Sequence, residues 1–192
     1  MIIGAGPAGI AAGARIAEAG LRVVVLDESS NVGGQIWRHR PGTAHPPAAR
    51  EWIDRLVLSG ATILCGASVV GLRPSAAGEE GARFVVTAER ENAPLVVAAM
   101  SVVLATGARE RFLPFPGWTL PGVIGVGGAQ ALLKSGLSFA GKRVVITGSG
   151  PMLLPVAAAL AGDGAEVTLV AEQAARASVL RFAASLWRKP AA

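Results

Sequence analysis

Residues 1–28 have the sequence MIIGAGPAGIAAGARIAEAGLRVVVLDE, which decides the fold of the first part of the chain. A short apolar run precedes Gly4, and an alanine-rich run from Ala8 to Ala19 stops at Gly20, as helices commonly do. The next run, Leu21–Asp27, is mostly apolar and ends in an acid, which is typical of a parallel strand covered on both faces. This order predicts a βαβ unit.

The turn between the first strand and the helix matches the pattern GxGxxG. Gly4 permits a tight turn, Gly6 lets a pyrophosphate approach the backbone, and Gly9 lets the helix pack close to the strand. The helix opens at Pro7 and Ala8, and its free N–H groups and dipole would face the phosphates. The motif predicts a dinucleotide site, and the alternative is a glycine-rich turn without a ligand.

An acid stands where an adenosine ribose would need one. Asp27 lies 18 residues after Gly9, at the end of the second strand. A carboxylate at this point can accept hydrogen bonds from the ribose hydroxyls. The neighbouring Glu28 is the alternative, and the spacing favours Asp27.

Composition excludes several other classes of protein. The 192 residues are 52% hydrophobic, but glycines and charges interrupt every long apolar run, so no membrane span is expected. The net charge of +5 comes from scattered basic residues, without the interleaved aromatics that single-stranded nucleic acids favour, so no nucleic acid partner is expected. The single cysteine excludes a disulfide framework and a CxxC centre, and indicates a reducing, cytoplasmic setting. The sequence also indicates no metal site.

A second strand–turn–helix–strand pattern occupies residues 142–170, with its helix expected over residues 151–161, and Gly148 lies 144 residues after Gly4. Its turn keeps Gly148 and Gly150 but has Leu153 in place of the third glycine, and the acid that follows is Glu172. A bulky Leu153 is expected to push the helix away from the strand, against the usual packing of such units. The turn is therefore predicted to bind NAD(P) or another adenine nucleotide, or to be an empty structural copy.

Three further stretches resemble the two-dinucleotide-binding flavoproteins, the family that includes the pyridine-nucleotide-dependent disulfide reductases. The loop Gly33-Gly34-Gln35 follows Asp27 as the flavin-side loop does in that family. Thr106-Gly107 matches the ATG motif that closes the first FAD segment, and the strand around Val69 matches the one whose backbone lies near the adenine. The resemblance implies FAD, rather than NAD, at the first turn.

Within that family, residues 33–38 and 108–123 are similar to the α subunits of opine oxidases, hydrogen cyanide synthase and dye-linked proline or D-hydroxyproline dehydrogenases. This similarity implies an FAD-dependent oxidoreductase that takes part in oxidising amino-acid-derived secondary amines beside a β subunit of the amine-oxidase type. It identifies no catalytic side chain here. Disulfide reduction is excluded because Cys65 stands alone. The alternatives are a truncated, non-catalytic nucleotide-binding or interaction module and an NAD(P)H-dependent flavin reductase.

The predicted fold class is α/β. A Rossmann-like FAD-binding βαβ segment with a small antiparallel insertion is expected over residues 1–110. In that insertion the charged segment 89–93 is expected to join strands over residues 83–88 and 95–99. A proline-rich connector is expected over residues 111–123, and the start of a second Rossmann-like, NAD(P)-type domain over residues 124–192. Further helices are expected over residues 128–134 and 174–187. Because this architecture stops early, the sequence is expected to be the N-terminal part of a longer chain.

Overall fold

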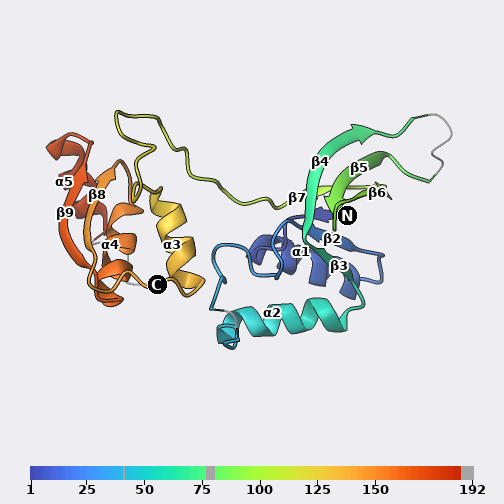
Figure 1. The fold of residues 1–192 in the computed structure, drawn as a ribbon. Helices are drawn as coiled ribbons and strands as arrows, with labels where there is room; N and C mark the ends of the chain where they lie inside the picture. The colour runs from blue at the N-terminus through green and yellow to red at the C-terminus, as the bar shows by residue number, and fades with distance from the viewer. Residues whose placement is uncertain (41, 77–80, 187–192) are drawn as a thin grey trace. The chain divides into compact units, whose positions relative to one another are not determined.

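The chain folds into two units, Met1–Ala108 and Arg109–Ala192 (Figure 1). The computed structural model describes residues 1–40, 42–76 and 81–186. Each unit contains parallel strands, and the first also contains an antiparallel sheet, so the predicted α/β class is confirmed. The proline-rich residues 111–123 lie in the second unit.

A parallel sheet of four strands forms the centre of the first unit, in the order β3-β2-β1-β7. These strands and the two helices between them have the following bounds: β1 Ile2–Ile3, α1 Pro7–Glu18, β2 Val24–Asp27, α2 Pro47–Leu58, β3 Thr62–Cys65 and β7 Val103–Leu104. The pairs β1–β2, β2–β3 and β1–β7 are all parallel. The βαβ unit predicted from residues 1–28 is therefore present.

Successive residues of β1 and β2 point to opposite faces of this sheet, and each face is buried by a different layer. Ile2 and Val25 pack with residues of α1 and α2, among them the fully buried Leu56. Ile3 and Leu26 pack on the other face with residues of the antiparallel sheet, among them Val86. The continuous apolar run at β2 is explained by this burial on both faces.

The antiparallel sheet has the order β4-β5-β6, with bounds β4 Ala67–Pro74, β5 Phe84–Arg90 and β6 Ala93–Ala99. Its second hairpin is tighter than the sequence predicted, since the charged segment 89–93 was expected to be the connection. Only Glu91 and Asn92 lie outside the strands, with φ values of 54° and 59°. Positive φ at both central residues matches the twist of a two-residue hairpin, so strand pairing continues through the flanking charged residues.

The second unit contains one parallel strand pair and three helices. Their bounds are α3 Val126–Lys134, β8 Arg143–Gly148, α4 Leu153–Gly162, β9 Glu166–Glu172 and α5 Arg176–Leu186. Ile146 of β8 packs with Leu153, Val156 and Leu160 of α4 in the core of this unit. The last helix was predicted to extend to Trp187, which lies outside the described residues. No helix in the described ranges is long and apolar enough to cross a membrane.

Helix α3 begins two residues before the predicted Gly128, because a distant carboxylate caps it. Glu110 accepts hydrogen bonds from the N–H groups of Val126 and Gly127, at 2.9 Å each. These N–H groups have no partner within the helix, and a negative charge at a helix N-terminus is favourable. A carboxylate 16 residues upstream thus sets the start of α3, which local sequence patterns do not encode.

Candidate nucleotide-binding site

The carboxyl ends of β1, β2 and β7 meet at one edge of the parallel sheet and bring the predicted site residues together. The glycine turn follows β1, Asp27 ends β2, and Ala105-Thr106 follows β7. The Gly4 N–H donates to the Leu26 carbonyl at 2.7 Å, and the Ala105 N–H donates to the Ile3 carbonyl at 2.8 Å. Ligands of open α/β sheets bind at this edge.

Two glycines of the fingerprint are required by close backbone contacts. A Cβ on Gly4 would lie 2.3 Å from the Ala105 carbonyl oxygen, and φ at Gly4 is +105°. A Cβ on Gly9 would lie 1.8 Å from the Gly4 carbonyl oxygen. Backbone atoms cannot move away as a flexible side chain can, so Gly4 and Gly9 hold the turn against α1 and β7.

The predicted flavin-side loop packs directly on the glycine turn. The Gly33 N–H donates to the Ala5 carbonyl at 2.8 Å. A Cβ on Gly34 would lie 2.9 Å from Cα of Gly6, and φ at Gly34 is +55°. Gly4 and Gly6 of the turn and Gly33 and Gly34 of the loop therefore form a backbone cradle that no side chain enters. Such a cradle fits the pyrophosphate of a dinucleotide.

Gly6 differs from the other glycines of the turn because space surrounds it. A Cβ there would meet only Cα of Gly34, at 4.0 Å. Gly6 is also the N-cap of α1, with extended backbone angles, and Pro7 occupies the first helical turn. Its freedom from contact leaves room for a phosphate at the positive end of the helix dipole.

Asp27 is turned inward and supports the glycine turn. Its carboxylate accepts hydrogen bonds from the Ala5 N–H at 2.5 Å and from the Ser29 N–H at 2.7 Å, and the side chain is buried. The sequence predicted a ribose contact for Asp27, which stays a prediction, and missed this contact with the turn. The neighbouring Glu28 is exposed at the same edge.

The remaining predicted residues lie around this edge at different distances from the turn. Gln35 follows Gly34 and is exposed, while Thr106 and Gly107 continue the chain beyond Ala105 and are exposed too. A Cβ on Gly4 would lie 3.1 Å from the Thr106 amide nitrogen. Val69 is half-buried on β4, where it packs on the face of the sheet that contains Ile3 and Leu26. Its predicted place near an adenine stays a prediction.

The second glycine turn has a different helix start. In the first unit α1 begins directly after Gly6, whereas α4 begins at Leu153, after the two turn residues Pro151 and Met152. The predicted start at Pro151 is therefore wrong. Leu153 is buried in the core and would contact a Cβ on Gly148 only at 3.6 Å. The helix N–H groups are thus set farther along the chain from the turn.

The comparisons with known proteins agree with this geometry. The family model of pyridine nucleotide-disulphide oxidoreductases matches residues 1–185. The chain belongs to this family. The resemblance to two-dinucleotide-binding flavoproteins is thereby confirmed.

Several known proteins are similar to this chain over most of its length. Hydrogen cyanide synthase subunit HcnB of Pseudomonas protegens is 34% identical over 99% of this chain and 41% of its own length. One opine oxidase subunit from Agrobacterium tumefaciens is 38% identical over 94% of this chain and 38% of its own length. The crystal structure of L-proline dehydrogenase from P. horikoshii matches with a TM-score of 0.64 at 26% identity, covering 88% of this chain and 34% of that one.

The predicted similarity to opine oxidase, hydrogen cyanide synthase and proline dehydrogenase is confirmed by these relatives. The chain spans about 40% of the length of the two curated relatives. Their remaining length contains parts that no residue of this chain aligns with.

Two histidines in the loop after Gly34 have a contact that the sequence did not predict. The rings of His39 and His45 lie 4.0 Å apart between centroids, at an interplanar angle of 60°. Burial, together with the nearby His39 and Arg50, lowers the pKa of His45. His45 is therefore neutral near neutral pH, and the pair packs as a ring contact within the loop.

Cys65 ends β3 and is half-buried, unlike the paired thiols that a disulfide-reducing member of the family needs. Burial, and the negative charge of Asp27, raise the pKa of its thiol. Below that raised pKa the thiolate fraction is small, and the thiolate is the reactive form. The thiol is thus a poor nucleophile near neutral pH.

We expect Cys65 of the folded chain to react with iodoacetamide roughly ten-fold more slowly near neutral pH than it does in the urea-unfolded chain. The rate should rise only as the pH passes above the ordinary range for a cysteine. Mass spectrometry of timed samples measures both rates. Equal rates in folded and unfolded protein would contradict the burial of this thiol.

Proposed function

We propose that this chain is the FAD-binding part of an oxidoreductase of the opine oxidase and hydrogen cyanide synthase subunit type. The observation that supports it most directly is the backbone cradle of Gly4, Gly6, Gly33 and Gly34, where added side chains would meet backbone or fill the space of a pyrophosphate. We assign the adenosine-diphosphate half of FAD to this cradle, with Asp27 or Glu28 toward the ribose. Thr106 and Gly107 are assigned to the closing side of the site.

The flavin would supply the redox chemistry by accepting a hydride from the substrate. The chain's own residues bind and orient the cofactor: the glycine turn receives the phosphates, Gln35 follows the cradle, and Val69 lies on the adenine side. We propose amino-acid-derived secondary amines as substrates because relatives are named for opines and L-proline. No side chain of this chain is assigned a catalytic role.

We further propose that the chain works with a second subunit of the amine-oxidase type, in a reducing, cytoplasmic setting. Relatives that share its sequence carry the word subunit in their names. The single cysteine is compatible with a reducing compartment.

For the second unit we propose a weaker adenine-nucleotide site, for NAD(P) or a related nucleotide. The turn keeps Gly148 and Gly150 at φ values of +152° and +113°. The later start of α4 and the presence of Leu153 disfavour the usual mode of NAD binding. The alternative for this unit is a structural copy without a ligand.

The purified 192-residue chain, saturated with FAD and then separated from free cofactor by gel filtration, is expected to retain the flavin visible spectrum. The cradle holds the pyrophosphate through backbone N–H groups, so retention should approach one equivalent per chain. In parallel, a thermal-shift assay measures how much NADH and FAD each raise the melting temperature of the chain. A colourless protein that NADH protects and FAD does not would contradict the proposal and favour an NAD(P)H-dependent reductase.

A further inference from the structure

The segment between Glu110 and α3 is closed at its base. Glu110 accepts hydrogen bonds from the Val126 and Gly127 N–H groups, so its carboxylate joins the two ends of residues 111–125. Surface loops of this length whose ends lie close together, and whose own side chains pack, are Ω-loops and frequently have a function. We call residues 111–125 the apolar loop; Figure 1 draws it as the yellow-green segment that leads into α3.

Local contacts hold the apolar loop in one shape. The Phe112 ring lies 5.7 Å from the Trp118 ring and 6.3 Å from the Phe115 ring, between centroids. Three turns are closed by hydrogen bonds of 3.0, 3.0 and 3.1 Å, in which the N–H groups of Trp118, Leu120 and Val123 donate to the carbonyls of Phe115, Gly117 and Leu120. Prolines at positions 114, 116 and 121 fix φ there. The loop is therefore preorganised, which reduces the entropic cost of binding a partner.

The preorganised loop exposes large apolar side chains. Their exposed fractions lie between 38% and 62%, for Phe112, Leu113, Phe115, Trp118, Leu120 and Ile124. No charged residue occurs in the sequence from Phe112 to Leu133. Clusters of exposed apolar side chains mark interaction surfaces, and aromatic residues without charges are typical of the centre of a protein interface.

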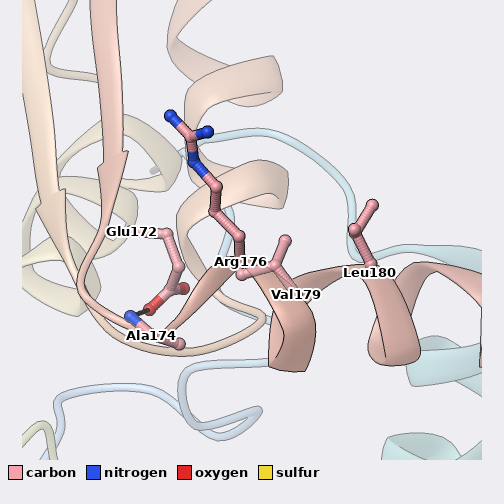
Figure 2. A pocket seen from close by; sticks show the side chains of 5 residues that line it. All are labelled: Glu172, Ala174, Arg176, Val179 and Leu180. Carbon is pink, nitrogen blue, oxygen red and sulfur yellow. Dashed lines mark hydrogen bonds between the residues drawn. The ribbon is translucent and has the colours of Figure 1, made fainter.

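A pocket in the second unit is a separate feature. It has a volume of about 290 Å³ and is lined by Glu172, Ala174, Arg176, Val179 and Leu180 (Figure 2). These residues belong to the end of β9, to α5 and to the turn between them, and none belongs to the apolar loop. A ligand in that pocket would leave the exposed rings of the loop uncovered, so the loop needs an occupant of its own.

Positive charge borders the apolar loop at its base. Arg109 and Arg111 are both exposed, on either side of Glu110 in the sequence. The Glu110 carboxylate is already bonded to the N-terminus of α3, the positive end of the helix dipole. A complementary partner therefore has an apolar groove whose border contains carboxylates.

Two other occupants match this surface less well. In a two-fold contact between copies of this chain, each loop would meet itself, so both borders would bring arginines while the Glu110 carboxylates stay bonded within each copy. A lipid bilayer does not accept irregular backbone in its hydrocarbon region, because the polar groups there lack partners. The apolar loop is irregular from residue 111 to residue 125.

We propose that the apolar loop is the docking surface for the second subunit, with Phe115 and Trp118 entering an apolar groove bordered by carboxylates. The inference rests on the proposed function, which gives this chain a second subunit of the amine-oxidase type. It adds the place at which that subunit binds and the chemistry of the surface that it presents.

The test isolates the tagged chain from its cells of origin and measures, by mass spectrometry, how much amine-oxidase-type subunit accompanies it. The double variant Leu113→Ser, Leu120→Ser changes the two most exposed of the six apolar side chains. We expect the amount of second subunit per chain to fall about tenfold, because apolar contacts at the interface are lost. FAD retention and urea unfolding should remain those of the wild type, since neither side chain is buried and neither belongs to the cradle.

Leu58→Ser is the matched control, because Leu58 is 85% exposed on α2, in the first unit. It should leave the amount of second subunit unchanged. Photo-crosslinking from p-benzoylphenylalanine in place of Trp118 is an independent measurement, which keeps the inference testable if the double variant does not fold. It should link the chain to the same amine-oxidase-type subunit.

Several outcomes would overturn the inference while the proposed second subunit stands. One is a folded double variant that keeps the wild-type amount of that subunit. Another is a co-isolated subunit that position 118 does not cross-link, or cross-links only to a second copy of the chain. A third is sedimentation of the wild type, but not of the double variant, with vesicles of phosphatidylcholine and phosphatidylserine.

A different result would count against the proposed function. If the wild-type chain is isolated without any amine-oxidase-type subunit, the proposed second subunit fails and the inference fails with it. FAD binding is judged separately, by the gel-filtration measurement on the chain alone, so the two failures are distinguishable.

Discussion

Replacing Gly9 with alanine is expected to lower the free energy of unfolding by about 3 kcal/mol, the upper end of the usual range for overpacking. The new Cβ would lie 1.8 Å from the Gly4 carbonyl oxygen and 3.3 Å from Cβ of Ala105. To relieve the contact, α1 must move away from the turn after β1. The cradle then loses its shape, so FAD binding should be lost with the stability. Urea unfolding and FAD retention measure the two effects.

Gly128→Ala is the matched control for this substitution. Gly128 is a helical glycine of α3, and a Cβ there would meet nothing within 4 Å. Alanine is the better helix former by up to about 1 kcal/mol, so this variant should be as stable as the wild type or more so. An unfolding midpoint for Gly9→Ala equal to that of the wild type would show that the close approach of α1 is not required.

Replacing Gly6 with alanine is expected to have the opposite pattern: unchanged stability and a loss of FAD affinity on the order of 100-fold, or about 2.7 kcal/mol. The backbone angles of Gly6, φ −74° and ψ −178°, are allowed for alanine. The added methyl would meet only Cα of Gly34, at 4.0 Å. It would fill the space that the pyrophosphate needs, so the substitution acts on the ligand alone.

Equilibrium dialysis with FAD, together with urea unfolding, separates the two effects at Gly6. Gly71→Ala is a suitable control, because a Cβ there would make an ordinary contact with Cβ of Thr87, at 3.9 Å, within the antiparallel sheet. It should change neither quantity. Wild-type affinity in Gly6→Ala would mean that no phosphate approaches this residue, and would contradict the assignment of the cradle.

The pair of substitutions also distinguishes two functions of glycine in one motif. Gly9 is needed by the protein, because backbone atoms occupy the place of its Cβ. Gly6 is predicted to be needed by the ligand, because the protein leaves the place of its Cβ empty. The pattern predicted both roles. The structure has the close packing that the role of Gly9 requires, and the phosphate contact of Gly6 stays a prediction.

Local patterns decided the elements of the first unit. The apolar runs, the glycine spacing and the helix stop at Gly20 are properties of neighbouring residues, and each limits φ, ψ or side-chain burial within a few positions. From these local patterns followed the βαβ order, the approximate bounds of α1 and β2, and the identity of the acid at the strand end. The same reasoning located the second turn at Gly148 and the missing third glycine.

Contacts between residues distant in sequence decided the starts of α3 and α4 and the close contacts around the glycine turn. Residues 16 positions apart set the start of α3, where Glu110 caps the helix. Only the folded chain brings Gly34 against Gly6 and the Ala105 carbonyl against Gly4. The predicted helix start at Pro151 was wrong because α4 begins only at Leu153, whose side chain packs in the core of the second unit.

The acids at the ends of β2 and β9 separate what the sequence determines from what only the tertiary structure decides. The sequence by itself determined that a carboxylate stands opposite each glycine turn, because strand length and turn spacing fix that register. Only the tertiary structure decided which N–H each carboxylate accepts, Ala5 in the first unit and Gly150 in the second. The reason is geometric: the turn and the acid come from different strands, so the donor that each carboxylate reaches is set only after those strands have paired.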